Sequence, residues 1–234
     1  STDIRDYWNH GIRFWDSDWA RFQEHSDSDI STIYKAWKEH EIIGSYWFKS
    51  EFDMGKIYGY QYARQYDVFD NFKANPQRTD LIINSWQVDS LEDMSLKPCH
   101  YDIQLVGSDD GFMIMWNQRS TDIVLGTPIN VQFYYLMGLL LEKWSGHKFN
   151  GVVGILKKVH IYDNGIELAK KITEVSKTLY TDNVTVDLEI KEEHKNLSFK
   201  DFIKTVEPKN FKINDYNFVL DEKIEMLTYN KKNK

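Results

Sequence analysis

The sequence lacks the features that define several classes of protein. It has one cysteine among 234 residues, so no internal disulfide can form, and the spacing of ligands that marks a zinc site is absent. No window offers the roughly 20 apolar residues that a transmembrane helix needs, and residues 1–6 contain no apolar stretch typical of a signal peptide. These absences predict a soluble, cytoplasmic protein without a membrane segment or a metal site.

The sequence also has fewer positively charged than negatively charged residues. Lysine and arginine number 29 against 36 aspartate and glutamate residues, which gives a net charge of -7 at pH 7. A surface with this balance repels the phosphate backbone of DNA, so we expect no nucleic-acid partner. A small anionic ligand in a local basic pocket remains compatible with the composition.

Repeats and linker-like stretches are absent as well. A chain of 234 residues that is 41% hydrophobic and 15% aromatic is long enough to bury one substantial core. We therefore expect a single domain over residues 1–234.

The spacing of apolar residues changes along the chain and predicts both helices and strands. Helices are expected at residues 3–11, with Asp3 as the N-cap, at 16–22, and from an N-cap at Ser31 through Trp37. Further helices are expected at 68–74, 130–144 and 164–177. Residues 55–64, punctuated by glycines, are expected to form a loop. Strands are expected at 81–86, 101–106, 112–116, 152–162 and 184–190, with residues 107–111 as the turn of a hairpin. Strands and helices that do not alternate regularly indicate an α+β fold.

Cys99 is the one thiol, and taken alone it is more often a small buried residue than a nucleophile. A nucleophilic cysteine needs a positive neighbour, because the thiolate attacks and the thiol does not. Arg119, expected at or just beyond the end of a strand, and His100 are the candidates for that neighbour.

Four ordered motifs resemble those of thymidylate synthases, and together they are far more specific than a lone cysteine. They are Leu96-Lys97-Pro98-Cys99-His100, Gln118-Arg119-Ser120-Thr121-Asp122, Leu125-Gly126-Thr127-Pro128-Ile129-Asn130 and His160-Ile161-Tyr162. Further similarity, from Asn9-His10-Gly11 to Asp215-Tyr216-Asn217, covers nearly the whole chain. The resemblance implies the family's α+β fold, a mixed sheet covered by helices, and a homodimer packed through its sheets.

The resemblance also implies a reaction. Cys99 would add to C6 of the pyrimidine of dUMP, and C5 would then take a one-carbon unit from 5,10-methylenetetrahydrofolate. Arg119 matches an arginine that contacts the nucleotide phosphate and lies near the thiol. Asn130 matches the side chain that recognises the edge of uracil, because an amide offers both a donor and an acceptor.

The remaining site residues are assigned by the same resemblance. Tyr58 and His100 match positions near the proton-transfer network around the base. The substrate-binding positions are Gln118, Ser120, Arg78 and, at the deoxyribose hydroxyl, His160 and Tyr162. The folate-binding positions are Asp122, Trp15, Leu96 and Gly126.

Each of these residues also has a purely structural interpretation. Asn130 would suit the N-cap of a helix that begins at Val131, Asp122 a turn, and His160 a hydrogen-bonded position in a strand. Trp15 and Tyr58 would suit a hydrophobic core. One family's ordered pattern favours the functional interpretation.

The sequence departs from the family's pattern in three places. Ser1 matches a point well after the family's start, so we expect the family's N-terminal segment to be missing. Where the family has two adjacent arginines, only Arg78 is present, with Asp80 nearby. The C-terminus is a tail of lysine and asparagine. These departures leave two alternatives open: a dUMP hydroxymethylase that yields 5-hydroxymethyl-dUMP, and a catalytically weakened homologue that binds the nucleotide without turnover.

Overall fold

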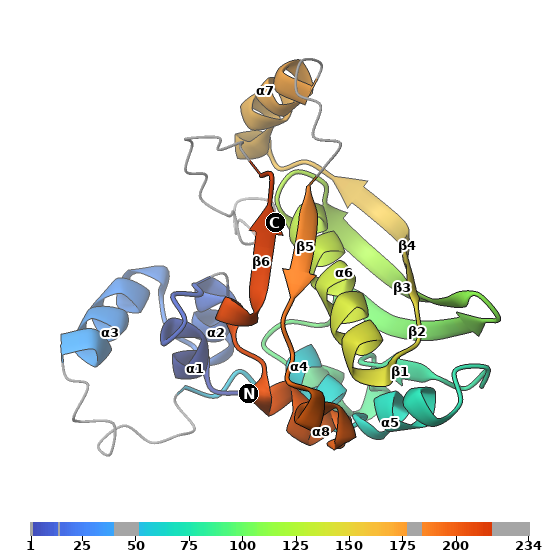
Figure 1. The fold of residues 1–234 in the computed structure, drawn as a ribbon. Helices are drawn as coiled ribbons and strands as arrows, with labels where there is room; N and C mark the ends of the chain where they lie inside the picture. The colour runs from blue at the N-terminus through green and yellow to red at the C-terminus, as the bar shows by residue number, and fades with distance from the viewer. Residues whose placement is uncertain (1, 14, 40–51, 177–183, 217–234) are drawn as a thin grey trace. The chain divides into compact units, whose positions relative to one another are not determined.

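A computed structural model describes residues 2–13, 15–39, 52–176 and 184–216 (Figure 1). Contacts divide the chain into two compact units. Of the described residues, the first contains those up to 64 together with 84–98, and the second contains 65–83 and those from 99 to 216. A single domain over the whole length stays a prediction. In the described ranges, no helix has both the length and the apolar character to cross a membrane.

The first unit is built from short helices. They are α1 (Ile4–Trp8), α2 (Asp16–Phe22), α3 (Asp27–Glu39), α4 (Tyr58–Ala63) and the 3-10 helix η2 (Val88–Asp93). Asp3 caps α1 as predicted, because its side chain accepts a hydrogen bond of 2.9 Å from the backbone N–H of Arg5. The helix ends at Trp8, somewhat before the predicted Gly11, and α2 has the predicted bounds.

Two predictions for this unit are wrong. Ser31 does not cap the third helix, because α3 begins at Asp27, where the backbone N–H of Ser26 donates to the Asp29 carboxylate at 2.9 Å. This contact stabilises the first turn in the manner of a capping box. The segment 55–64 is not a loop, since it contains α4. One glycine costs a helix only about 1 kcal/mol, and buried Gln61 ties α4 to the preceding turn by donating to the Lys56 carbonyl at 3.1 Å.

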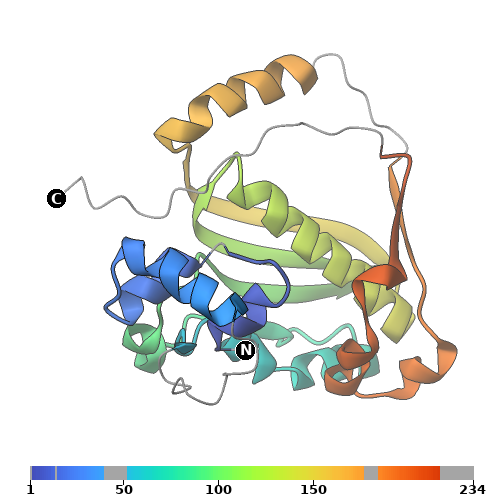
Figure 2. The ribbon, with the colours of Figure 1, turned by 90° about the vertical axis from the view of Figure 1, so that its left-hand side faces the viewer.

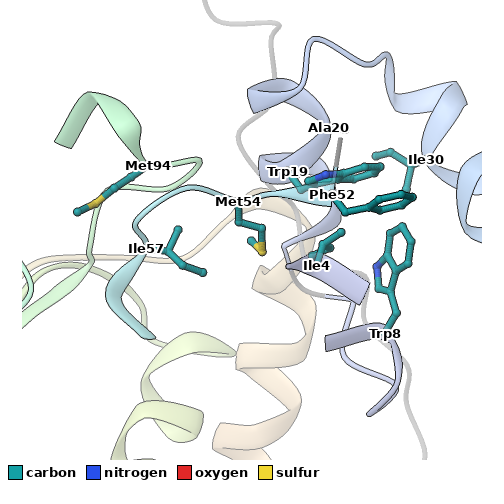
Figure 3. Close-up of a cluster of buried hydrophobic side chains, with 9 residues drawn as sticks. All are labelled: Ile4, Trp8, Trp19, Ala20, Ile30, Phe52, Met54, Ile57 and Met94. Carbon is teal, nitrogen blue, oxygen red and sulfur yellow. The ribbon is translucent and has the colours of Figure 1, made fainter. Parts of the chain in front are cut away.

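The core of the first unit packs aromatic rings among aliphatic and methionine side chains (Figure 3). Trp19 and Phe52 are stacked with ring centroids 6.0 Å apart, and the ring of Trp8 meets that of Trp19 edge-on at 5.4 Å. The indole N–H of Trp8 donates to the buried carboxylate of Asp16 at 2.7 Å. The buried hydrophobic residues of this core are Ile4, Trp8, Trp19, Ala20, Ile30, Phe52, Met54, Ile57 and Met94. Burial of each large side chain contributes roughly 1.5–3 kcal/mol, which holds the short helices together.

The second unit is organised around a mixed sheet in the order β1-β2-β3-β4. Its strands are β1 (Ile82–Asn84), β2 (His100–Ser108), β3 (Gly111–Asp122) and β4 (Phe149–His160). β2 and β3 form the predicted antiparallel hairpin, while β4 pairs with β3 in parallel. β3 continues to Asp122 because β4 supplies partners that far, so the prediction that Arg119 lies at or beyond a strand end is wrong.

Helix α6 (Gly126–Ser145) covers one face of this sheet (Figure 2). It begins four residues before the predicted start, because Pro128 lies in its first turn, where a missing N–H costs nothing. It ends at Ser145, one residue after the predicted end, and Gly146 follows as the C-cap with a φ of 82°, the left-handed conformation that favours glycine. Tyr134 of α6 stacks on Trp116 of β3 with centroids 4.7 Å apart. A Cβ at Gly138 would lie 2.2 Å from the ring of Phe149, so glycine is needed for this close approach to β4.

The rest of the second unit surrounds this layer. Its helices are α5 (Asp67–Ala74), α7 (Ile166–Ser176), α8 (Phe199–Phe202) and the 3-10 helices η3 (Asp163–Gly165), η4 (Glu192–Asn196), η5 (Ile203–Thr205) and η6 (Pro208–Asn210). Strands β5 (Thr185–Leu188) and β6 (Phe211–Asn214) form a separate antiparallel pair. The rings of Phe69 and Phe199 pack at 4.1 Å and join α5 to α8.

Candidate active site

The thiol of Cys99 lies directly before β2 and beside β3. The backbone N–H of Arg119 donates to the Cys99 carbonyl at 2.8 Å, which holds the two residues opposite each other. Nη2 of Arg119 is 4.0 Å from Sγ of Cys99, and both side chains are half-buried. A permanent positive charge at this distance favours the thiolate over the thiol. The geometry therefore suits an activated nucleophile.

The neighbouring residue, His100, points to α6 and pairs with a tyrosine. Its Nδ1 and the hydroxyl of Tyr134 are hydrogen-bonded at 2.6 Å. Burial lowers the pKa of His100 from 6.5 to about 4, because a charged imidazolium would lose its hydration. At neutral pH His100 is uncharged, so of the two candidate positive neighbours of Cys99 only Arg119 carries a charge.

This buried histidine predicts an acid-sensitive fold. As the pH falls from 6.5 to about 4, the unfolded chain binds a proton that the folded chain does not, so the free energy of unfolding decreases by at most about 1.4 kcal/mol per pH unit. Urea denaturation at pH 7 and pH 5 should show this loss, and His100→Asn should reduce it. His10→Asn, at an exposed position, is the matched control and should keep the wild-type loss. An equal loss in His100→Asn would contradict the assignment.

Asn130 lies in the first turns of α6. Because the helix begins at Gly126, Asn130 is not its N-cap, and that structural interpretation is wrong. Asn130 and Tyr134 are four residues apart and so lie on the same face of the helix. The side-chain amide of Asn130 is half-buried and has no hydrogen-bond partner in the part of the chain that the structure describes. Its donor and acceptor are available to a ligand beside the His100–Tyr134 pair.

A second group of polar residues gathers where β3 and β4 end. Asp122 and His160 are register partners at the carboxyl ends of these parallel strands. The Asp122 carboxylate accepts a hydrogen bond of 2.9 Å from the N–H of Val124, which starts the turn into α6, and Gly126 follows as the first helical residue. The ring of Tyr162 meets that of His160 edge-on, with centroids 4.9 Å apart.

His160 is not the hydrogen-bonded strand histidine of the structural interpretation. Its Nδ1 is buried and has no hydrogen-bond partner in the described ranges. A buried polar atom without a partner costs about 1–3 kcal/mol, and such atoms concentrate at sites that bind ligands. The position next to Tyr162 therefore suits a polar ligand group.

Two other predicted substrate-binding residues lie on β3 on either side of Arg119. Gln118 is buried, and its amide accepts from the indole of Trp116 at 3.2 Å and donates to the Ser120 carbonyl at 3.1 Å. Ser120 is half-buried. The Gln118 amide thus supports the strand from the face that α6 covers.

Arg78 is exposed and paired with its own neighbour. Its guanidinium donates two hydrogen bonds to the Asp80 carboxylate, from Nε at 2.9 Å and from Nη2 at 2.7 Å. These hydrogen bonds lower the pKa of Asp80. The carboxylate competes with any phosphate for this guanidinium.

Three predicted residues belong to the first unit. The ring of Trp15 lies between those of Tyr7, at 4.9 Å, and Tyr58, at 6.5 Å. Tyr58 opens α4, and Leu96 is half-buried after η2. The structure thus brings Trp15 and Tyr58 together within this unit, while the predicted site residues other than these three belong to the second unit.

Comparison with known proteins identifies the family. The family model described as thymidylate synthase matches residues 1–228, which includes both units. The chain belongs to the thymidylate synthase family. The α+β fold with a mixed sheet, expected from the sequence, is confirmed.

Two known proteins are similar to this thymidylate synthase family member. A thymidylate synthase of Phytoplasma mali (strain AT) is 28% identical over 187 residues, which cover 76% of this chain and 64% of that protein. The chain thus matches less than two thirds of the length of this relative. The crystal structure of thymidylate synthase from T4 phage superposes with a TM-score of 0.68 over 91% of this chain and 82% of that one, at 23% identity. That likeness shows a shared fold.

Sequence reasoning missed Tyr134, which connects His100 to the helix that carries Asn130. The spacing could have indicated this role, because Tyr134 follows Asn130 by four residues and so lies on the same face of the predicted helix. An aromatic in an apolar helix is more often a core residue, and Tyr134 fills that role too by stacking on Trp116.

Proposed function

We propose that this chain methylates dUMP to dTMP, with 5,10-methylenetetrahydrofolate as the source of both the carbon and the hydride. The observation that carries the proposal is the 4.0 Å approach of Arg119 Nη2 to Cys99 Sγ in a chain of the thymidylate synthase family. A thiol poised beside a fixed positive charge is what addition to an electron-poor pyrimidine carbon requires.

The proposed reaction proceeds through a covalent adduct. Sγ of Cys99 forms a bond to C6, and the C5–C6 π electrons move toward C5 and the C4 carbonyl. C5 then bonds to the methylene carbon, the carbon–nitrogen bond to folate breaks, and the C5 proton leaves. Hydride from tetrahydrofolate reduces the exocyclic methylene as Sγ departs, which yields dTMP and dihydrofolate. Each step is easier than direct attack by an unactivated C5.

The base and the phosphate are assigned to residues around Cys99. Asn130 would hydrogen-bond O4 and N3–H of uracil with its acceptor and donor, a pattern that cytosine reverses. Arg119 and Ser120 would contact the phosphate, with Gln118 supporting the strand between them and Arg78 contributing when released from Asp80. These roles are supported by the Asn130 amide, which has no hydrogen-bond partner among the described residues, and by the approach of the Arg119 guanidinium to the Cys99 thiol.

The deoxyribose and the folate are assigned to the polar residues at the ends of β3 and β4 and to residues of the first unit. The orphaned Nδ1 of His160 and the adjacent Tyr162 suit the deoxyribose hydroxyl. We assign Asp122 and Gly126, with Trp15 and Leu96, to the folate. Neutral His100 and Tyr58 would serve proton transfer around the base, because an uncharged imidazole relays protons without repelling Arg119. We propose a cytoplasmic location, because a reducing compartment keeps a free thiol available for catalysis.

A homodimer packed through the sheets is the assembly we propose. On β4, the alternate residues Val153, Ile155 and Val159 are exposed on the strand, although they are large and apolar. A two-fold interface presents the same patch from both subunits, and an exposed apolar strand face suits such self-association.

Ile155→Asp should therefore dissociate the dimer. Ile155 is 47% exposed, so the change should leave the fold intact, whereas a carboxylate buried without a partner in the interface would destabilise the dimer. Sedimentation velocity should show a monomer for this variant. Ile213→Asp changes an isoleucine that is 61% exposed on β6 and should remain a dimer. A dimeric Ile155→Asp would place the interface elsewhere.

Turnover tests the function itself. Incubation with dUMP and methylenetetrahydrofolate should produce dihydrofolate absorbance at a rate proportional to enzyme concentration. Formation of 5-hydroxymethyl-dUMP without dihydrofolate would indicate the hydroxymethylase, in which water replaces hydride at the C5 methylene. Binding of dUMP with neither product would indicate the weakened homologue.

A further inference from the structure

A lysine lies beside Arg119 on the neighbouring strand. The register pairs Gln118 with Leu156 and Ser120 with Lys158, so Arg119 lies opposite Lys157. Residues opposite each other on parallel strands project from the same face, and strands are about 4.8 Å apart. Gln118 is buried on the face that α6 covers, so Arg119 and Lys157 share the other face. Two positive side chains thus lie side by side on this face, and Arg119 is the one that contacts Cys99.

Tyr101 holds the ammonium of Lys157 over β3. The β2–β3 register shifts between His100 and Asp102, and this irregularity includes Tyr101. The Lys157 ammonium donates a hydrogen bond to the Tyr101 hydroxyl and lies 4.9 Å from the centroid of its ring. Because Tyr101 is on β2 and Lys157 on β4, the contact spans β3, the strand of Arg119.

The local charges favour an anion between these two side chains. Like charges directly opposite in a sheet repel each other, and an anion bound between them would offset that repulsion. Within the described residues, Lys157 makes no ion pair. The nearest carboxylate on this face of β2, Asp102, accepts a hydrogen bond of 2.9 Å from Asn117. A guanidinium and an ammonium on one face match the charge of a phosphate group.

We propose that Lys157 binds the 5′-phosphate of the nucleotide together with Arg119. The inference rests on the proposed function, because it takes dUMP as the ligand of the Cys99 site. Lys157 would supply a second cation where Arg78 is occupied by Asp80. Tyr101 would act as the positioning residue for that cation.

Lys157→Met tests this role, with Lys157→Arg and Lys148→Met as companions. Lys148→Met makes the same change of charge just before the other end of β4. We expect Lys157→Met to raise the Kd for dUMP about tenfold, because one charged hydrogen bond to the phosphate is lost. The affinity for inorganic phosphate, measured by competition with dUMP, should fall by the same factor. At saturating dUMP, kcat should stay within about twofold of wild type, since the lysine does not touch the reacting carbon. Lys157→Arg should restore binding, and Lys148→Met should bind as wild type.

The alternative outcomes separate the two proposals. An unchanged Kd for dUMP in Lys157→Met, with normal turnover of the wild type, overturns the role of Lys157 and leaves the proposed function standing. Dissociation of the dimer with an unchanged Kd does the same and assigns Lys157 to the subunit interface. An equal loss of dUMP affinity in Lys148→Met would show that the effect comes from general surface charge, which also overturns the role of Lys157. A wild type that fails to bind dUMP overturns both.

Discussion

Cys99→Ser should lower kcat for dTMP formation by at least about 1,000-fold, while the Kd for dUMP changes by less than about threefold. Serine has nearly the same size as cysteine, so the backbone contact between Cys99 and Arg119 should persist. A hydroxyl beside Arg119 stays protonated at neutral pH and does not add to C6. Dihydrofolate absorbance reports the turnover, and isothermal titration with dUMP reports the binding.

The thermal midpoint of Cys99→Ser is the control for folding. An unchanged midpoint with lost turnover assigns the effect to chemistry. Retention of more than about a tenth of the wild-type kcat would contradict a nucleophilic role, because no other thiol exists in the chain.

Arg119→Met should lower kcat/KM for dUMP about 1,000-fold. The variant loses a charged phosphate contact, worth roughly 1.5–3 kcal/mol, and also the positive charge 4.0 Å from the thiol. Steady-state kinetics measure the first loss. The rate at which iodoacetamide alkylates Cys99 at pH 7 measures the second, because only the thiolate reacts, and we expect that rate to fall.

Arg64→Met is the matched control, since it removes a guanidinium from an exposed position at the end of α4. Its kcat/KM and alkylation rate should equal those of the wild type. Arg119→Lys should recover part of the alkylation rate through its charge but less of the phosphate binding, which needs the planar guanidinium. Wild-type alkylation in Arg119→Met would show that another group favours the thiolate.

Local signals predicted the elements whose ends are determined by their own residues. Gly146 ends α6 through its left-handed backbone, and α2 has the expected bounds. The start of α6 was placed too late because the prediction followed the apolar run after Asn130, whereas the helix already begins at Gly126, with Pro128 in its first turn. Helix α4 was missed because Gly59 and its aromatic neighbours resemble a loop, whereas the buried Gln61 favours the helix.

The proximity of Cys99 and Arg119 follows from the hairpin that the sequence predicted. The turn pairs Ser108 with Gly111, and counting back along both arms brings Cys99 opposite Ser120. The register shift between His100 and Asp102 moves the partner by one residue, to Arg119. Sequence reasoning supplied the turn but no sign of the bulge.

The pairing of β4 with β3 was beyond local reasoning. Parallel strands are joined by a crossover, here through α6, and their register depends on packing across the whole unit. That register places His160 beside Asp122 and Lys157 beside Arg119. The resemblance assigned His160 to the site from its motif, whereas Lys157 belongs to no motif and emerged from the structure alone.

The most direct test of the central claim is a mass measurement on the covalent complex. Wild-type protein is incubated with 5-fluoro-dUMP and methylenetetrahydrofolate, denatured, and digested, and the peptide that contains Cys99 is weighed. We expect a mass increase equal to the nucleotide plus the folate on that peptide, and none in Cys99→Ser. An unmodified Cys99 peptide under saturating ligands, or the same adduct in Cys99→Ser, would contradict it.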